Sequence, residues 1–546
     1  MTYLPRFSLS YLVALAAVFA AVLPVRAAEP APAQVEQWGT FELALTGPTD
    51  GNPFLDVTLS ADFSNGQKTV TVDGFYDGGG VYRVRFMPDA TGTWTYFTHS
   101  NRWPLTQKRG VFTVTAPSKD NHGPVRVANT YHFAYADGTP FKQIGTTCYT
   151  WTHRPAEVEE QTLRTLAASP FNKLRMCVFP QTHGTSTMPP TRFPFAGEGT
   201  KPDYARFNPE FFQHLDRRVG QLRDLGVECD LILFHPYDDE HIWGLDTMPP
   251  EVEDRYLRYI VARLGAYRNI WWSMANEYDF VRTKTEADWD RYFQVVMAAD
   301  PYDHLRSIHN GKVIYNHNQP WVTHVSLQNG LAVTEPGKAQ IYRDVYRRPI
   351  VYDEVEYEGN HVYRWAQLTS REMVHRFWAG TVAGTYVGHS EYWVQPGDTS
   401  EFVWLGQGGV LRGESAPRLA FLRKVMEDGP AGGIDPIDKW WEPRVGGKPG
   451  EYYLWYFGHE KPTSWPFQLY RDGIAEGTIF SAEIIDTWEM TITPVPGEFV
   501  AKKKDRYSFV DAAGRSIALP GKDGIALRIR RTGGTQGEIS DKPPGY

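Results

Sequence analysis

The hydrophobic pattern divides the chain into three regions of different periodicity. Between residues 34 and 117, apolar and polar side chains alternate, and turn-rich segments separate the runs. The clearest runs lie at 82–86, 93–97 and 111–115. Alternation with frequent turns is typical of antiparallel strands, and it predicts an N-terminal β-sandwich over 34–117.

From about residue 130, short apolar runs alternate with longer helical patterns, which indicates parallel strands linked by helices. Eight such runs are present, the number that a closed (β/α)8 barrel needs. They span 143–148, 173–179, 229–234, 270–275, 306–309, 324–327, 350–354 and 385–392. The predicted fold class is therefore α/β, a TIM barrel over residues 125–428.

Helix signals support the same division. Asn208 and Pro209 place a capping side chain and then a proline at the first helical position. Other helices are predicted to begin near 157, 250, 286 and 371, with a last one at 416–426. The Gly/Pro-rich segment after 428 ends the barrel, and alternation resumes at 452–457, 467–470 and 525–529. We predict an antiparallel β domain over 432–531 and a disordered tail over 532–546.

The first 27 residues resemble a signal peptide. Arg6 precedes an apolar run at 11–23, and a small-residue site ends at Ala27. The run is shorter than the ~20 residues that span a bilayer, so we predict export to the periplasm or the outside of the cell, and no membrane anchor.

Composition narrows the function classes. The net charge is −8 with dispersed signs, which argues against a nucleic-acid or membrane partner. The three cysteines, Cys148, Cys177 and Cys229, lie inside apolar runs and are predicted to be buried thiols. Aromatic residues make up 14% of the chain, which suits stacking against sugar faces.

Barrel enzymes carry their reactive groups at the C-terminal ends of the strands. Polar or aromatic side chains are found there in all eight predicted strands. They are, in chain order, Tyr149, Trp151, Arg175, His235, Asn276, Glu277, His309, Asn310, Gln328, Glu354, Glu356, His389, Glu391 and Trp393.

Two of these residues suit glycoside hydrolysis. Glu277 on strand four and Glu354 on strand seven would face each other across a closed barrel, one as proton donor and one as nucleophile. Arg175 and His309 are candidates for keeping Glu354 charged. A retaining pair predicts a carboxyl separation of about 5 Å. Trp151 and Trp393 are candidate stacking platforms or, equally, packing residues at the barrel rim. His389 and Glu391 either face the substrate or form a buried ion pair that closes the barrel, and the remaining polar residues are expected to bind substrate.

The segment Trp272–Glu277 resembles the strand-four signature of clan A glycoside hydrolases, and Pro349–Gly359 resembles strand seven of the apiosidase-like barrel hydrolases. This resemblance implies that Asn276 binds a sugar 2-hydroxyl, that Glu277 is the acid/base and that Glu354 is the nucleophile. Glu356 is the alternative nucleophile. The segments starting at Trp38 and ending at Trp94 resemble the β-sandwich often fused to such barrels.

Other chemistries fit less well. His235, Asp238, Asp239 and His241 are metal-ligand types, but sugar-binding loops use the same residues and no HExxH helix accompanies them. We expect no metal and no cofactor. A serine-hydrolase elbow and a phosphate-binding loop are missing from the sequence.

The prediction is thus an exported retaining glycoside hydrolase acting on a plant or algal polysaccharide or its fragments. A transglycosylase or a non-catalytic carbohydrate-binding barrel stays open as an alternative. The sugar, the linkage, exo or endo action and the oligomeric state are not predicted.

Overall fold

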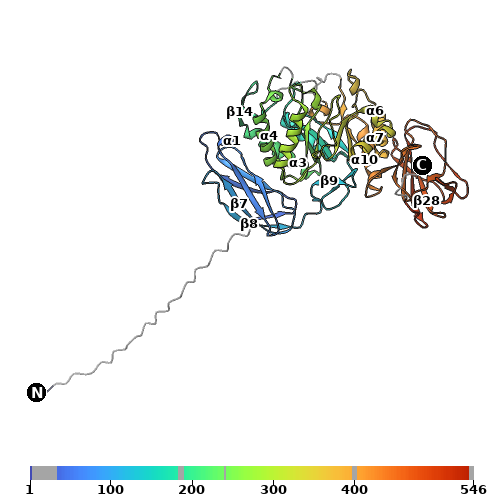
Figure 1. Cartoon of the computed structure of the whole chain (residues 1–546), viewed down its shortest axis with the longest axis horizontal. Helices are drawn as coiled ribbons and strands as arrows, with labels where there is room; N and C mark the ends of the chain where they lie inside the picture. Colours follow the sequence, from blue (N-terminus) through green and yellow to red (C-terminus); the bar gives the residue numbers. More distant parts are fainter. Residues whose placement is uncertain (3–32, 183–189, 239–240, 396–402, 540–546) are drawn as a thin grey trace.

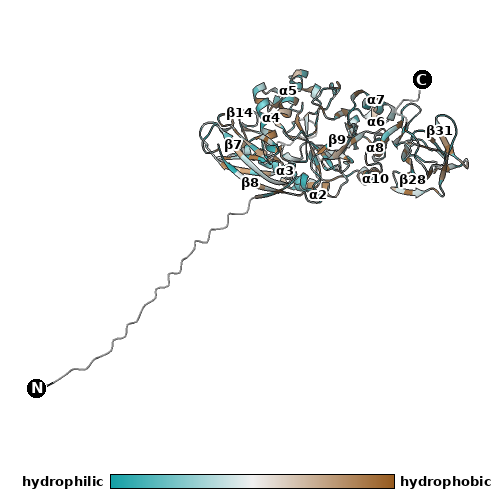
Figure 2. Ribbon diagram, turned by 60° about the horizontal axis from the view of Figure 1, so that its bottom comes forward, coloured by the Kyte–Doolittle hydropathy of each residue, from teal (hydrophilic) through white to brown (hydrophobic). Residues whose placement is uncertain are grey.

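The computed structural model describes residues 1–2, 33–182, 190–238, 241–395 and 403–539. The predicted signal peptide therefore lies almost wholly outside the described residues. Figure 1 shows three parts in a row, with the N-terminal β-sandwich and the C-terminal sheet at opposite ends of the barrel, and Figure 2 shows the same order from another side. Among the described residues, no helix combines the length and the apolar character that crossing a bilayer requires.

The N-terminal part consists of a five-stranded and a three-stranded sheet packed face to face. The alternation at 82–86 places Tyr82, Val84 and Phe86 in the core between them. Arg85, on the other face, is also buried, because that face packs against the barrel. The strands of the five-stranded sheet are, in spatial order, β1 (Ala33–Glu36), β8 (Arg109–Thr115), β7 (Gly92–Ser100), β3 (Leu59–Ser64) and β4 (Thr69–Asp73). Those of the three-stranded sheet are β2 (Phe41–Thr46), β6 (Val81–Phe86) and β5 (Phe75–Tyr76).

Eight parallel strands form the central barrel, which confirms the predicted fold class. A parallel bridge between His309 and Ser326 joins the first and last strands of the sheet and closes the ring. In chain order the strands are β11 (Gly145–Thr147), β12 (Lys173–Cys177), β15 (Glu228–Phe234), β16 (Ile270–Ala275), β17 (Arg306–Ser307), β18 (Val325–Gln328), β19 (Ile350–Glu354) and β21 (Tyr386–His389). The predicted run 385–392 is divided, and its end forms β22 (Glu391–Tyr392).

Helices surround the barrel and begin where the sequence signals lie. The Asn208 side chain accepts a hydrogen bond from the Glu210 N–H at 3.1 Å and so caps the helix that Pro209 starts. The helix α7 has its own Pro336 at the first turn and is not among the predicted helices. The main helices are α2 (Ala156–Ala167), α3 (Pro209–Asp224), α4 (Pro250–Leu264), α5 (Glu286–Ala299), α7 (Pro336–Tyr346), α8 (Ser370–Val382) and α10 (Ser415–Glu427).

A hairpin of β9 (Val125–Ala128) and β10 (His132–Tyr135) closes the N-terminal end of the barrel. The Phe133 ring lies 5.0 Å from Trp271 and 5.1 Å from Tyr386, which begin β16 and β21. Because this end is filled, the opposite end of the barrel is where a substrate can enter.

The C-terminal part is a nine-stranded antiparallel sheet that contacts α8 through β24 and β25. Its last strand continues to Gly533 and Gln536 bridges to Ile474, so order extends past 531, where the tail was predicted to begin. The strands of the sheet are β23 (Asp435–Asp438), β24 (Glu442–Lys448), β25 (Tyr452–Tyr456), β33 (Ile525–Gly533), β28 (Ile479–Asp486), β30 (Phe499–Lys503), β31 (Ser508–Asp511), β27 (Gln468–Tyr470) and β29 (Thr491–Pro494).

Candidate active site

Glu277 follows the end of β16 in a left-handed backbone conformation, with φ +42°. Residues other than glycine adopt this region only at a conformational cost. Its Oε2 accepts a hydrogen bond from the Tyr237 hydroxyl at 2.6 Å. Asn276, immediately before it, donates from Nδ2 to the hydroxyls of Tyr237 and Tyr149 at 2.5 and 3.3 Å.

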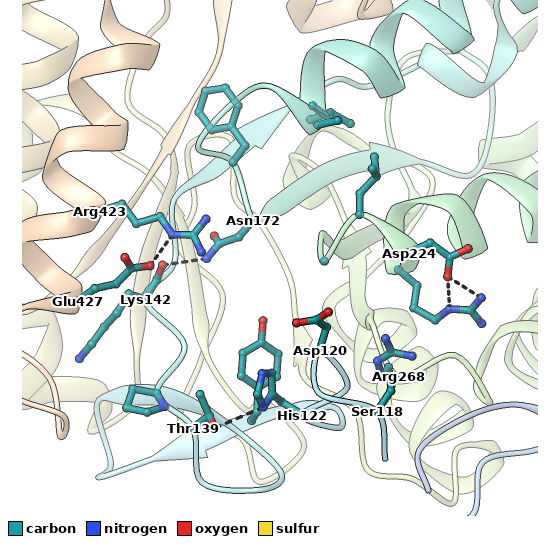
Figure 3. Close-up of a pocket in the computed structure, with 18 of the residues that line it drawn as sticks. Ser118, Asp120, His122, Thr139, Lys142, Asn172, Asp224, Arg268, Arg423 and Glu427 are labelled. Carbon is teal, nitrogen blue, oxygen red and sulfur yellow. Dashed lines mark hydrogen bonds and ion pairs between the residues drawn. The ribbon is translucent and has the colours of Figure 1, made fainter. Parts of the chain in front are cut away.

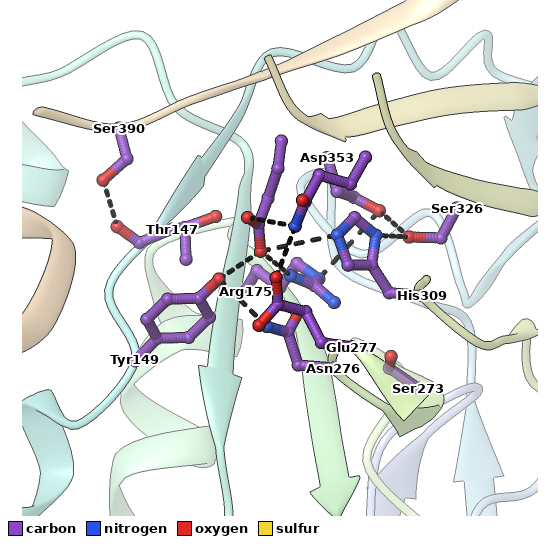
Figure 4. A network of polar contacts seen from close by, with 12 residues as sticks. Thr147, Tyr149, Arg175, Ser273, Asn276, Glu277, His309, Ser326, Asp353 and Ser390 are labelled. Carbon is purple, nitrogen blue, oxygen red and sulfur yellow. Dashed lines mark hydrogen bonds and ion pairs between the residues drawn. The ribbon is translucent and has the colours of Figure 1, made fainter. Parts of the chain in front are cut away.

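Glu354 is the last residue of β19, which is separated in the barrel from β16, the strand before Glu277, by β17 and β18. Its Oε1 accepts a hydrogen bond from the Tyr149 hydroxyl. Arg175 Nη1 and His309 Nε2 lie 3.5 and 3.4 Å from the same oxygen, so the two predicted partners do contact this carboxylate (Figure 4).

One amide nitrogen holds the two glutamates together. Gln328 Nε2 donates to Glu277 Oε1 at 2.8 Å and to Glu354 Oε2 at 3.0 Å. Those two oxygens are therefore at most about 5.8 Å apart, the sum of the two distances. A register shift between Leu327 and Gln328 pairs Gln328 with Glu354 and so places the amide between the carboxylates.

The environments of the two carboxyl groups separate their pKa values. Burial and the negative charge of Glu354 raise the pKa of Glu277 to about 7. Burial also opposes ionisation of Glu354, but the nearby His309 ring, the charge of Arg175 and the hydrogen bond from the Tyr149 hydroxyl outweigh it and lower the pKa of Glu354 to about 2. Near neutral pH, one group can therefore hold a proton while the other is ionised.

A buried ion cluster lies beneath Glu354 inside the barrel. Lys173 Nζ lies 2.7 Å from both Asp230 Oδ2 and Asp353 Oδ1, on three different strands. Ser326 donates to Asp353 at 2.5 Å, and its hydroxyl also lies 2.9 Å from His309 Nδ1. These contacts fix the side chains that support Glu354, and Lys173 and Asp353 were not among the predicted site residues.

The carboxylates open into a cavity of about 830 Å³ at the C-terminal end of the barrel. Of the residues predicted from the sequence, Tyr149, Glu277, Gln328, Glu354 and Glu356 line it. The rest of the cavity wall consists of residues that are not among the predicted site residues, namely Gln181, Tyr237, Asn329, Gly330, Tyr357, Tyr363, Arg364, Trp365 and Leu405. The aromatic residues at 357–365 could have been suspected, because this segment follows the nucleophile strand directly.

Three predicted substrate residues lie behind the cavity wall. His235 stacks on Tyr237 with ring centroids 5.3 Å apart, and Asn310 accepts a hydrogen bond from the backbone of Gln328 at 3.3 Å. Trp151 is fully buried, with Nε1 3.2 Å from the sulfur of Met176, so the prediction that it stacks on sugar was wrong. Its large apolar ring is a core residue.

The predicted residues of strand eight also lie away from the cavity lining. His389 and Glu391 are buried, at 0% and 2% exposure, and they form no ion pair with each other. The prediction of substrate contact by these two side chains was therefore wrong. Trp393 is partly buried, and its carbonyl accepts a hydrogen bond from Arg412.

The residues considered as a metal cluster are engaged elsewhere. Asp238 accepts hydrogen bonds from the backbone N–H groups of Trp243 and Leu245 at 3.0 and 3.2 Å. His241 lies 2.6 Å from Asp246. Asp239 lies outside the described residues.

A larger cavity of about 1160 Å³ opens between the N-terminal part and the underside of the barrel (Figure 3). Its rim carries exposed ion pairs such as Arg423 with Glu427 and Arg223 with Asp224. Neither Glu277 nor Glu354 lines this cavity, so we place the active site at the opposite end of the barrel.

The closed barrel with two glutamates at its C-terminal end is the arrangement of a glycoside hydrolase. The model of the apiosidase-like catalytic domain matches residues 127–427, more than half of the chain. Models of two domains of unknown function, DUF5060 and DUF5605, match residues 34–101 and 440–530. The chain therefore belongs to the apiosidase-like family and is a glycosidase.

Solved structures agree with this assignment. A "putative glycoside hydrolase" from Bacteroides vulgatus ATCC 8482 is 41% identical, with a TM-score of 0.88, over 92% of this chain and 100% of that chain. A family 5 glycoside hydrolase from the same organism is 16% identical, with a TM-score of 0.56, over 75% and 93% of the two chains, and shows the shared fold. No curated protein matches the chain.

Proposed function

We propose that the protein hydrolyses a glycosidic bond with retention of configuration, with Glu277 as acid/base and Glu354 as nucleophile. The observation that carries this proposal is the Gln328 amide, which keeps the two carboxylates within about 5.8 Å. Retaining pairs lie about 5–5.5 Å apart, whereas inverting pairs need about 6.5–9.5 Å to admit a water.

In the first step, protonated Glu277 gives its proton to the glycosidic oxygen as the bond from that oxygen to the anomeric carbon breaks. The Glu354 carboxylate forms a new bond to the same carbon and produces a glycosyl ester. Ionised Glu277 then takes a proton from water, whose oxygen attacks the anomeric carbon and releases Glu354. Tyr149 lines the cavity beside Glu354 and would contact the sugar, whereas Asn276 is buried and would orient the Tyr149 and Tyr237 hydroxyls to which it donates.

The aromatic lining of the cavity supports a sugar as the substrate, and we propose a glycan of plant or algal origin. Tyr149, Tyr237, Tyr357 and Trp365 in its lining offer aromatic faces of the kind that stack on sugar rings. The name of the family makes apiose-containing glycosides the first compounds to test.

The test is product release from a panel of such glycans by the wild type and by the variants Glu277→Ala and Glu354→Ala. We expect turnover to fall by at least about a thousandfold in both variants. Proton NMR of the earliest product should show the anomeric configuration of the substrate. An inverted first product would reject the nucleophile role of Glu354.

Glu356→Gln is the matched control, since Glu356 also lines the cavity but pairs with Arg376 at 3.1 Å. We expect this variant to keep its turnover within about tenfold of the wild type. If Glu356→Gln is inactive and Glu354→Ala is active, Glu356 is the nucleophile.

A further inference from the structure

A second group of ionisable side chains lies behind the active-site wall. Glu358 in β20 (Glu358–Gly359) and Glu391 in β22 are partners in a parallel register, just beyond the ends of barrel strands β19 and β21. With His389, they bring two carboxylate oxygens and one imidazole nitrogen to within 4.8 Å of one another. All three side chains are buried, at 0%, 2% and 0% exposure for Glu358, Glu391 and His389.

The hydrogen-bond donors to the two carboxylates belong to residues other than these three. Glu358 Oε1 accepts hydrogen bonds from the Ser370 hydroxyl and from the backbone N–H of Glu414. Glu391 accepts hydrogen bonds from the backbone N–H groups of Arg412 and Gly413. These dipolar groups orient two neighbouring carboxylates, and the positive charge of Arg412 also acts on Glu391.

Two atoms of the group have no hydrogen-bond partner among the residues that the structure describes. They are Glu358 Oε2 and His389 Nε2, both fully buried. The other ring nitrogen, His389 Nδ1, lies 3.0 Å from the Thr146 hydroxyl, which can accept its proton and leave a lone pair on Nε2. An orphaned carboxylate oxygen and an orphaned imidazole nitrogen are costly when buried, unless a cation binds them.

We propose that Glu358, His389 and Glu391 bind a divalent transition-metal ion, with zinc as the best match. Zinc takes imidazole and carboxylate ligands together, whereas calcium and magnesium take oxygen ligands. Ligand atoms around a tetrahedral ion lie roughly 3.3 Å apart. The side chains would therefore close inward slightly when the ion binds.

The ion would stabilise the wall of the active site. Tyr357 directly precedes Glu358 and lines the substrate cavity, and Ser370 begins α8. A metal held between β20 and β22 would fix the segment 357–370 against the barrel. The site has no contact with the two catalytic glutamates, so we assign it a structural role.

The test is zinc binding by the full chain after treatment with a chelator, followed by calorimetric titration. We expect one zinc ion per chain and a rise in melting temperature on binding. Glu391→Gln and Glu358→Gln keep the shape of the side chain and should each weaken zinc binding by at least tenfold. A folded wild type that binds no zinc would reject the proposal.

Glu372→Gln is the matched control. Glu372 belongs to another group with His375 and His459, which lies closer to the surface. It should leave zinc binding unchanged, and loss of binding in this variant alone would place the metal there and reject the proposal. If the Gln variants at 358 and 391 do not fold, anomalous diffraction at the zinc edge from wild-type crystals decides between the two positions.

Discussion

The protonation state of Glu277 should govern the pH dependence of the reaction. The acid must be protonated in the first step, and its pKa is raised to about 7, so kcat/KM should fall about tenfold per unit above this pH. Glu354, with a pKa lowered to about 2, stays ionised from pH 4 upward. A pH profile measured on one substrate checks this, and a rate that keeps rising beyond pH 8 would contradict it.

The Tyr149 hydroxyl should contribute to the reaction rate, because it donates a hydrogen bond to Glu354. We expect Tyr149→Phe to lower kcat by about 10- to 100-fold, since a charged acceptor loses a hydrogen bond. Tyr352→Phe is the control, as the Tyr352 hydroxyl is buried but has no hydrogen-bond partner in the described parts of the chain. Equal rates for the two variants would show that the Tyr149 bond does not support the reaction.

For single residues, the sequence could locate the two glutamates but could not distinguish residues that line the substrate cavity from residues that are buried behind it. Glu354 ends β19 and Glu277 lies two residues past the end of β16, so their positions follow from the strand pattern. Trp151 and His389 also follow strands, yet they are buried, because the packing of α9 (Trp404–Gln407) and other late segments covers them. Contacts between segments so distant in sequence leave no periodic signal.

Among the elements, strands β12, β15 and β19 are joined inside the barrel by Lys173 and its two aspartates. We expect Lys173→Met to lower the free energy of unfolding by about 3–5 kcal/mol, because it leaves two buried carboxylates with only the more distant Arg175, at 3.9 and 4.0 Å, as a cation. Lys338→Met removes an exposed pair with Glu335 and should cost under about 1 kcal/mol. Urea unfolding measures both, and equal losses would reject the role of Lys173.

Elements with a strong local signal could be predicted from the sequence. Strands β16 and β19 begin and end at the predicted residues, and α3 begins at its proline. Strand β17 is only two residues long, shorter than predicted. The hairpin that fills the barrel end was not predicted, because Phe133 is selected by its contacts with distant strands and not by a local pattern.

For the whole molecule, Arg263 connects the first two parts. Its guanidinium is fully buried and contacts Asp216 of the barrel at 2.6 Å and Asp77 of the N-terminal sandwich at 2.9 Å. We expect Arg263→Leu to cost about 3–5 kcal/mol and to loosen the sandwich.

Limited proteolysis between residues 116 and 124 should show faster cleavage in Arg263→Leu than in the wild type. Arg223→Leu, which removes a pair with the exposed Asp224, is the control and should be cleaved at the wild-type rate. Unchanged proteolysis in Arg263→Leu would show that other contacts hold the two parts together.

The position of Glu277 also affects the stability of the folded chain. Its pKa of about 7 exceeds the ordinary 4.5, so the folded state holds this proton more tightly than the unfolded chain. The contribution of this proton to the free energy of unfolding is full below pH 4.5 and is lost as the pH rises through 7, and it amounts to at most about 3 kcal/mol. Calorimetry should find Glu277→Gln more stable than the wild type at pH 8 and similar at pH 4. Selection for activity thus opposes selection for durability at this residue, and the inactive variant is the better form for capturing a substrate complex.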